Sequence, residues 1–162
     1  MSDQLTNVVV AGLGGQGVLK ASDILAEAAF RAGLDVKKAE VHGMSQRGGS
    51  VTSDVRFGPD LSAASPMAPD GEADYLLVLA ESQVDVARGR LREGGVLIGP
   101  DAVDVAALPN ARSLNVALLG VLSGRIEIDE ASWQAAIRAH LPEKLHEANA
   151  EAFRLGRAAA GA

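Results

Sequence analysis

The sequence predicts a single α/β domain, residues 1–162, in which helices flank a mostly parallel sheet. Short, wholly apolar segments alternate with segments whose apolar residues recur at helical spacing. Hydrophobic residues make up 48% of the chain and aromatic residues only 3%, so the expected core is aliphatic, as is typical of helices packed on a parallel sheet. A length of 162 residues suits one domain with a sizeable core.

The first part of the chain predicts three strands and one helix. Residues 7–11 are an apolar run typical of a buried parallel strand, and a glycine-rich turn leads from them into a helix at 18–32. Residues 34–41 are expected to form a second strand. Apolar and polar residues alternate in 49–57, which indicates a third strand with one buried face.

An irregular surface segment is expected next, because residues 58–71 are rich in Pro, Ser, Ala and Asp. A buried strand at 75–80 follows. A helix is then expected from Ser82 or Gln83 to Arg92, with Ser82 as its N-cap. A short strand at 96–98 and a loop at 99–110 complete this part.

The last part of the chain is expected to be mainly helical. The expected elements are a short strand at 113–115, a helix at 116–122, a helix at 130–140 with Asp129 as its N-cap, and a closing helix from 143 to about 160. Trp133 is expected to be a packing anchor, and His140 and His146 to be solvated surface groups. The pattern does not predict the order of the strands.

The charge of the chain limits the classes of partner. Its formal net charge is −6, and it has no run of basic residues longer than Lys37–Lys38, whereas a nucleic-acid surface needs a basic face. No apolar stretch approaches the roughly 18 residues that cross a bilayer. The first residues lack the basic and apolar regions of a secretion signal. We therefore expect a cytoplasmic protein with no nucleic-acid or membrane partner.

Cysteine is absent, which excludes disulfides, a thiolate nucleophile and any cluster or zinc ion held by cysteine. The three histidines, His42, His140 and His146, are not spaced as one metal site. No metal ligands and no catalytic nucleophile or base are predicted. Any redox chemistry would therefore need electrons carried by a partner or a bound cofactor.

The turn Gly12-Leu13-Gly14-Gly15-Gln16-Gly17 matches the dinucleotide fingerprint, with glycines at Gly12, Gly14 and Gly17. Such a turn allows a phosphate to approach backbone N–H groups at a helix N-terminus. Glu40 lies about where a ribose-binding acid would sit. Three readings stay open: nicotinamide dinucleotide binding, another phosphate-bearing ligand or partner surface, or glycines needed only for packing. The chain lacks the paired Tyr/Lys or His/Asp of a dehydrogenase, and Tyr75 is expected in the core.

A second polar block spans residues 39–51 between two expected strands. It holds Glu40, His42, Met44, Ser45, Gln46, Arg47, Gly48 and Gly49. Polar groups gathered on a loop at a strand end are more often functional than structural. The alternative is a solvated turn in which Arg47 pairs with Glu40.

The chain resembles the gamma-type domain of the 2-oxoacid:ferredoxin oxidoreductases, most closely the beta subunits of the indolepyruvate branch. Three blocks carry the resemblance in order: Gly12–Val18, Glu40–Gly58, and the C-terminal set Asn149, Ala152, Phe153 and Gly156. A weaker fourth block is Asn115–Gly120. The second block is the specific one. Family members are longer between the strand at 96–98 and Asn115, where this chain has only residues 99–114.

The resemblance implies a small subunit of an enzyme that converts a 2-oxoacid, CoA and oxidised ferredoxin into acyl-CoA, CO2 and reduced ferredoxin. Thiamine diphosphate and 4Fe-4S clusters are then expected on a large partner subunit, and no cofactor is bound by this chain alone. The substrate would be indolepyruvate or another aryl pyruvate, with branched-chain 2-oxoacids or pyruvate as alternatives. Two copies of each subunit are the family expectation.

The resemblance also implies roles for the two blocks. Contacts to a cofactor or to an anion such as CoA are expected from Gly12, Gly14, Gly15, Gln16, Gly17, Arg47, Gly48 and Gly49. An interface near the active centre is expected from Glu40, His42, Met44, Ser45 and Gln46. Two other functions stay open: a stand-alone NAD(P)-dependent oxidoreductase, and a scaffold that binds no small molecule.

Overall fold

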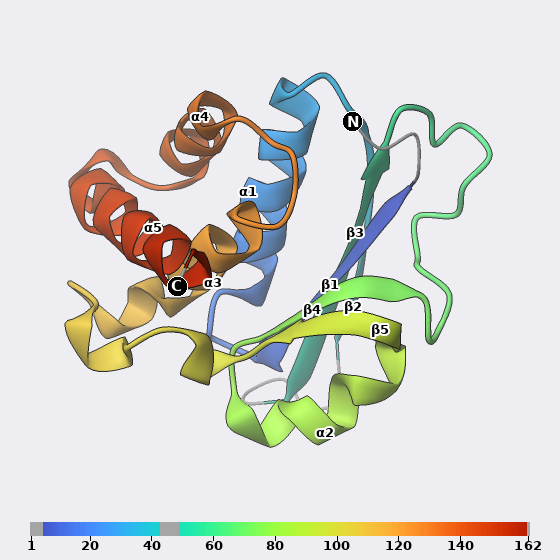
Figure 1. Cartoon of the computed structure of the whole chain (residues 1–162), viewed down its shortest axis with the longest axis horizontal. Coiled ribbons are helices and arrows are strands. Elements are labelled where there is room, and N and C mark those ends of the chain that lie inside the picture. Colours follow the sequence, from blue (N-terminus) through green and yellow to red (C-terminus); the bar gives the residue numbers. More distant parts are fainter. Residues whose placement is uncertain (1–4, 43–48, 162) are drawn as a thin grey trace.

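A five-stranded sheet with helices on both faces forms the framework of the chain (Figure 1). The computed structural model describes residues 5–42 and 49–161, and the side chain of His42 lies outside this description. The strands are β1 (Thr6–Leu13), β2 (Asp35–His42), β3 (Ser50–Gly58), β4 (Ala73–Val78) and β5 (Leu91–Ile98). The helices are α1 (Val18–Arg31), α2 (Val84–Ala87), α3 (Leu114–Ser123), α4 (Glu130–His140) and α5 (His146–Ala160), with 3-10 turns between several of them.

The strands follow the order β2-β3-β1-β4-β5. β1 pairs parallel to β4, and β4 pairs parallel to β5. β3 runs antiparallel to both β1 and β2, so four strands point in one direction and β3 points in the other. The sheet is therefore mixed but mostly parallel, which confirms the expected fold class.

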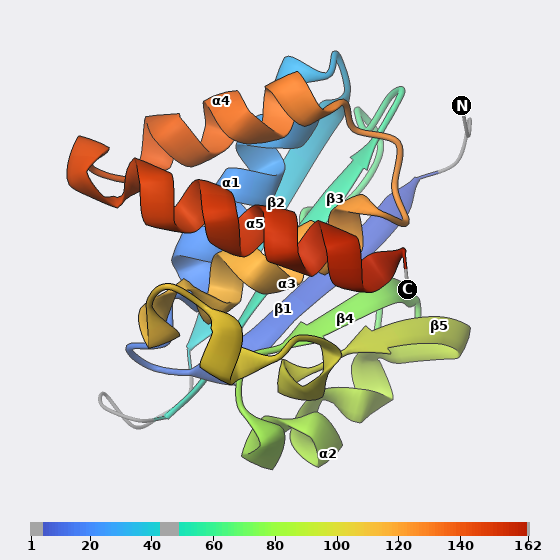
Figure 2. The same ribbon diagram turned by 60° about the vertical axis from the view of Figure 1, so that its left-hand side comes forward.

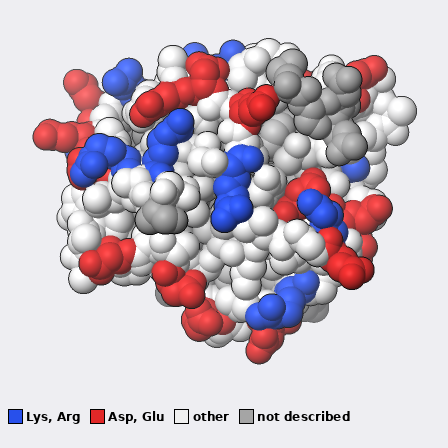
Figure 3. Space-filling view, in the orientation of Figure 1, with Lys and Arg blue, Asp and Glu red and all other residues white. Residues whose placement is uncertain are grey.

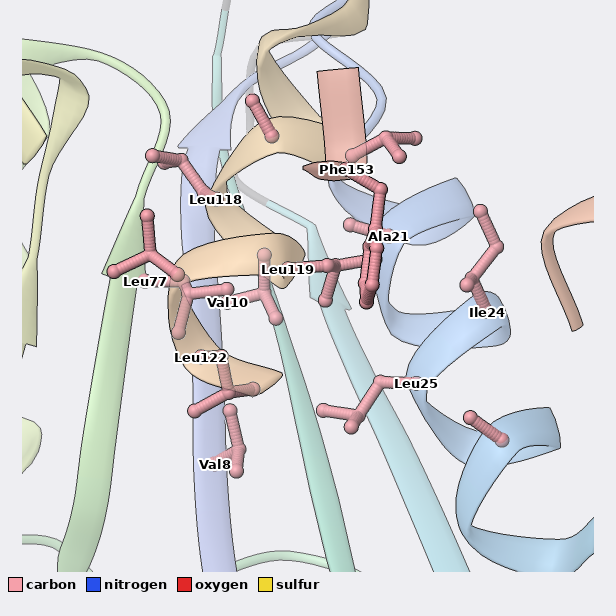
Figure 4. Packing of buried hydrophobic residues seen from close by; sticks show 14 of the residues in the cluster. Val8, Val10, Ala21, Ile24, Leu25, Leu77, Leu118, Leu119, Leu122 and Phe153 are labelled. Atoms are coloured by element: carbon pink, nitrogen blue, oxygen red, sulfur yellow. The ribbon is translucent and has the colours of Figure 1, made fainter. Parts of the chain in front are cut away.

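Two apolar clusters hold the layers together. Helices α1, α3, α4 and α5 lie on one face of the sheet, where Val8 and Val10 of β1 meet Leu118, Leu119 and Leu122 of α3 (Figures 2 and 4). On the opposite face, α2 covers the alternate residues of the same strands. That second cluster comprises Val9, Ala11, Ala73, Leu76, Val78, Val84 and Ala87. Because both faces are covered, the central strands carry apolar residues without alternation.

Helices α3 and α5 cross at two glycines, Gly120 and Gly156. A Cβ on Gly156 would lie 1.8 Å from the carbonyl oxygen of Ala117, and one on Gly120 would lie 2.2 Å from that of Phe153. The two backbones can approach this closely only because neither position carries a side chain. Two of the family blocks, Asn115–Gly120 and Asn149–Gly156, thus meet in a helix packing contact.

Residues 59–71 pack over the α2 face of the sheet through a buried polar network. Asp54 of β3 is only 1% exposed and accepts hydrogen bonds from Arg90 at 2.5 Å and from the Ala68 N–H at 2.9 Å. Arg56 is also buried, and it donates to the carbonyl oxygen of Ser65 at 2.6 Å. The prediction of one buried face for this strand was therefore wrong, because the irregular segment covers its polar side.

Three expected elements differ from the structure. The helix expected to reach Arg92 is only a single turn at Val84–Ala87, flanked by 3-10 turns, and no side chain caps it at Ser82. β5 begins at Leu91 instead of Val96. The strand expected at 113–115 is wrong, because Asn110 caps a 3-10 turn there and α3 already begins at Leu114.

The C-terminal helices confirm the expectations for Asp129 and Trp133 and contradict those for the two histidines. Asp129 caps α4 by accepting from the Ser132 N–H at 3.0 Å. Trp133 is fully buried and packs against Phe153, with ring centroids 5.4 Å apart. His146 was expected to be a solvated group, but its Nε2 lies 2.7 Å from the carbonyl oxygen of Leu141. His140, expected to be solvated as well, is partly buried and lies 3.4 Å from the carboxylate of Glu27.

The surface carries charges of both signs. Acidic (red) and basic (blue) side chains are interspersed over the face shown in Figure 3. Among the described residues, no helix is long and apolar enough to cross a membrane.

Candidate functional site

The candidate site lies where the carboxyl ends of β1 and β4 meet. From β1 the chain continues through α1 to β2, at one edge of the sheet. From β4 it continues through α2 to β5, at the opposite edge. Such a switch point leaves a crevice outside the strand ends, where open α/β sheets bind ligands. A cavity of about 450 Å³ opens here. Its lining residues are Gly15, Gln16, Gly17, Leu79, Ala111, Arg112, Leu114 and Asn115.

The glycine turn forms one wall of this cavity. Gly15 and Gly17 both have positive φ, +88° and +83°, in the region that favours glycine. Gly17 directly precedes α1, and no described side chain caps that helix. The first N–H groups of α1 therefore remain available at the positive end of the helix dipole.

The side chain of Gln16 closes the turn from inside. Its Oε1 accepts the Leu13 N–H at 2.8 Å, and its Nε2 donates to the Leu79 carbonyl oxygen at 3.3 Å. Gly12 lies beneath it, where a Cβ would stand within 3.1 Å of Val18, Gln16 and Leu79 atoms. These two residues hold the turn against the end of β4, which is a structural role.

The turn and the second polar block meet in space. The Gly14 N–H donates to the Gly49 carbonyl oxygen at 2.9 Å. Since β2 and β3 form an antiparallel pair, β2 ends and β3 begins at the same end of the sheet as the glycine turn. Ser50 extends the contact to Gln83 with a 2.6 Å hydrogen bond.

Much of the second block lies outside the described residues. Met44, Ser45, Gln46, Arg47 and Gly48 belong to this part, so their expected contacts remain predictions. His42 ends β2 opposite Val51, and only its backbone is described.

Glu40 does not occupy the position of a ribose-binding acid. In a Rossmann fold the strand that carries this acid lies next to the first strand. Here β3 lies between β1 and β2. Glu40 instead forms a 3.0 Å ion pair with Lys38, which also pairs with Asp23 of α1. Burial lowers the pKa of Lys38, but its bonds to Asp23 and Glu40 outweigh burial and raise that pKa overall.

Sequence reasoning missed Leu79 and Arg112 as lining residues. Arg112 is exposed, and its N–H donates to the Asn110 side chain at 2.9 Å, which fixes the backbone of this turn. No partner among the described residues engages its guanidinium. The surrounding sequence resembles any polar loop, so no signal singled out Arg112. Asn115 belonged to the weakest of the four blocks, although its Nδ2 donates to the Gly17 carbonyl oxygen at 3.2 Å.

Among the described residues, the site combines the uncapped N–H groups of α1 with the guanidinium of Arg112, and the cavity lining contains no nucleophile. Within the part of the chain that the structure describes, no three His, Asp or Glu side chains are grouped to hold a metal ion. The described lining can bind an anion and contains no Asp, Glu or His side chain for acid–base chemistry.

Comparison with known families decides the assignment. A family model described as pyruvate ferredoxin/flavodoxin oxidoreductase matches residues 7–159. The chain belongs to this family. Membership confirms the resemblance drawn from the glycine turn and the second block, and it makes the chain a small subunit of a ferredoxin oxidoreductase.

Characterised relatives cover nearly the whole chain. The indolepyruvate oxidoreductase subunit IorB of Thermococcus kodakarensis is 35% identical, with 93% of each chain covered. That of Methanothermobacter thermautotrophicus is 31% identical, with 95% of this chain and 97% of the relative covered. The first alignment extends over 190 positions, more than the 162 residues of this chain, so the relative has residues that this chain lacks.

Solved structures share the fold. The gamma subunit of a keto/oxoacid ferredoxin oxidoreductase from Geobacter sulfurreducens superposes with a TM-score of 0.79 at 26% identity, over 96% of this chain and 98% of that one. A 2-oxoglutarate:ferredoxin oxidoreductase from Magnetococcus marinus superposes with a TM-score of 0.83 at 20% identity, over 99% of this chain but only 32% of that one.

Proposed function

We propose that this chain is the small subunit of an enzyme that oxidises an aryl pyruvate, such as indolepyruvate, with CoA and ferredoxin. The products are the acyl-CoA, CO2 and reduced ferredoxin. The chain supplies anion contacts and a docking surface, while a larger partner holds thiamine diphosphate and iron–sulfur clusters. The observation that carries this proposal is the hydrogen bond between Gly14 and Gly49, which joins the glycine turn to the specific second family block beside one cavity.

The anion at this cavity is a phosphate of CoA in our proposal. The N-terminus of α1 presents N–H groups, and Arg112 presents a guanidinium with no described partner. Both groups favour phosphate, and a guanidinium can donate two parallel hydrogen bonds to it. Arg47 and Gly48 would complete the contact from the block beside it. CoA supplies the thiol that takes up the acyl group.

The partner carries the redox chemistry because this chain has no residues for it. Cysteine is absent, so no thiolate can hold an iron–sulfur cluster. The ketoisovalerate oxidoreductase subunit VorA of Methanothermobacter marburgensis is 31% identical over 81% of this chain, yet the match spans only 31% of VorA. VorA thus has a large additional region in the same polypeptide. A separate subunit that packs directly against this chain would correspond to that region.

Within this proposal, the substrate is an aryl pyruvate. Support comes from the relatives named for indolepyruvate, which include the 35% and 31% identical subunits. The pyruvate synthase subunit PorC of Methanothermobacter thermautotrophicus is also 31% identical, over 89% of each chain. Pyruvate is therefore the alternative substrate that an assay must include.

Purification from the native host tests the proposed assembly. A tagged full-length chain should bring down a larger, brown, iron–sulfur protein that binds thiamine diphosphate. Recovery of the tagged chain as a colourless protein without that companion would contradict the proposal.

Substitution of Arg112 tests the proposed CoA contact in that complex. Arg112→Ala should raise the KM for CoA about tenfold or more, since a charged hydrogen bond is worth about 1.5–3 kcal/mol, and should change the KM for the 2-oxoacid little. Arg88 is an exposed arginine beside α2, so Arg88→Ala is the matched control and should leave the KM for CoA and the KM for the 2-oxoacid unchanged. Equal effects of the two substitutions would remove Arg112 from the site.

The stand-alone dinucleotide enzyme is the second candidate function. The strand order disfavours it, since β3 separates Glu40 from the glycine turn. A ligand that binds only the folded chain raises its melting temperature. A shift with NADH and none with CoA would favour the dinucleotide enzyme over the proposed subunit.

A further inference from the structure

We propose that the chain has a second binding site, which takes a small aromatic carboxylate, at the end of the sheet opposite the glycine turn. A cavity of about 290 Å³ opens there, where the first residues of β1, β4 and β5 meet the connection between α3 and α4. None of its described lining residues also lines the cavity beside the glycine turn. The proposal does not depend on the reaction proposed above.

The two cavities lie at opposite ends of the same strand. β1 runs from Thr6, which lines the cavity proposed here, to Leu13 beside the glycine turn. At about 3.3 Å per residue, the strand separates these ends by about 23 Å. A small molecule bound at Thr6 is therefore too far away to contact the glycine turn.

One wall of the cavity is apolar and is part of the folded core. Phe57 of β3 is only 4% exposed, and Leu34, Tyr75 and Ile126 are partly buried against the same core cluster. Aromatic side chains favour offset or edge-to-face contact with a further ring. Ligand pockets occupy about 300–1,000 Å³ and have mostly apolar walls with a few polar groups. A cavity near the lower end of that range suits a ligand with a single ring.

Arg125 supplies a cation whose backbone is held in place. Its N–H donates to the Leu122 carbonyl oxygen at 2.8 Å, and its carbonyl oxygen accepts from the Tyr75 hydroxyl at 3.2 Å. Among the described residues, its guanidinium has no hydrogen-bond or ion-pair partner. Because a guanidinium can donate two parallel hydrogen bonds to a carboxylate, Arg125 is the anion-binding group of this site.

The other charged residues of the cavity are already engaged. Arg92 donates from its Nε to Asp74 at 2.8 Å, so these two charges offset each other. Asp74 also accepts the Asn7 N–H at 2.7 Å. Glu127 lines the cavity as well and has an interaction of its own. Arg125 is thus the one cation available to a ligand, which favours a singly charged carboxylate over a doubly charged phosphate.

Titration of the ¹⁵N-labelled full-length chain with phenylacetate, followed through its amide chemical shifts, locates the site. Phenylacetate combines one ring with one carboxylate and should bind with a dissociation constant of about 1 mM or lower. The amide signals of Thr6, Gly58 and Ile126 should shift to saturation, and those of Gly15 and Gly17 should not. Absence of a saturable shift at Thr6, Gly58 and Ile126 would overturn the proposal.

Two substitutions test the part played by the guanidinium. Arg125→Ala removes charged hydrogen bonds and should raise the dissociation constant for phenylacetate at least about tenfold. Arg112 is another exposed arginine, at the other cavity, so Arg112→Ala is the matched control and should leave that constant unchanged. Both replaced side chains are exposed, so both variants should keep the wild-type melting temperature in the absence of ligand. Equal effects of the two substitutions on binding would contradict the site.

A neutral analogue tests the charge of the ligand. In 2-phenylacetamide an amide replaces the carboxylate, while the ring and the overall shape are kept. It should bind to the wild-type chain at least about tenfold more weakly than phenylacetate, because it cannot pair with the Arg125 guanidinium as an anion. Equal affinity for the two compounds would show that the cavity does not select a carboxylate.

Discussion

Asn115 donates a hydrogen bond from its Nδ2 to the Gly17 carbonyl oxygen at 3.2 Å, across 98 positions of sequence. The same amide nitrogen would lie 2.5 Å from a Cβ on Gly17. The start of α3 thus fixes the start of α1, and the cavity lies between them. This contact explains why an apparently apolar helix begins with a buried amide.

A comparison of Gly17→Ala with Gly15→Ala measures that contact. Both glycines have positive φ, which costs other residues about 1–2 kcal/mol, but a Cβ on Gly15 would meet nothing within 4 Å. Gly17→Ala should lower the free energy of unfolding by at least about 1 kcal/mol more than Gly15→Ala, because its Cβ also displaces Asn115. Denaturant unfolding measures both, and equal losses would show that Asn115 does not restrict Gly17.

The crossing of α3 and α5 depends on Gly156. Gly156→Ala would place a methyl group 1.8 Å from the Ala117 carbonyl oxygen, and neither backbone can move without disturbing the core. We expect a loss of about 3 kcal/mol or more, seen as a melting temperature lower by roughly 6–12 °C. Gly89→Ala is the control, since nothing lies within 4 Å of its Cβ. An unchanged melting temperature for Gly156→Ala would contradict the close crossing.

The ion pair of Asp54 and Arg90 fixes the segment 59–71. In Asp54→Ala the largely buried guanidinium of Arg90 keeps Asp70 as its one acidic partner. Because a buried charge then loses its buried partner, the free energy of unfolding should fall by about 3 kcal/mol. Asp85→Ala breaks the exposed pair with Arg88 and should change stability by less than about 0.5 kcal/mol. Urea unfolding of the two variants separates these cases. Similar small losses would mean that the buried pair does not hold the segment.

The N-cap of α4 makes stability depend on pH. The Ser132 hydroxyl and then its N–H donate to Asp129, which lowers the pKa of that carboxyl below its ordinary 3.8. A lowered folded pKa gives stability that is present above the unfolded value and is lost as the pH falls through the folded one. Asp129→Asn keeps the cap but not the charge. Its melting temperature should therefore fall less than that of the wild type between about pH 5 and pH 2, and parallel curves would contradict this.

The sequence predicted the elements whose patterns are local. The apolar run of β1, the glycine turn and the cap at Asp129 each depend on neighbouring residues, and the structure has them at or near the expected positions. The antiparallel β3 was less evident. Its signal was the short connection between 42 and 50, since parallel neighbours need a crossover of a dozen or more residues.

Features that depend on distant contacts were not predicted. Asp54 and Arg56 alternate with apolar residues like an exposed face, and only the packing of residues 59–71 buries them. The helix before β5 ended early because Gly89 follows its single turn, while Gly94 and Gly95 lie within the strand. Arg112 lines the cavity just before the start of α3, which Asn115 bonds to Gly17, and this long-range relation has no local signature in the sequence.

Turnover by the isolated chain is the most direct test of the division of labour. The purified chain should show no oxidation of indolepyruvate with CoA and a viologen acceptor, or with NAD or NADP. Addition of the larger subunit should start CoA-dependent viologen reduction. Steady turnover by the chain alone with a pyridine nucleotide would contradict the account.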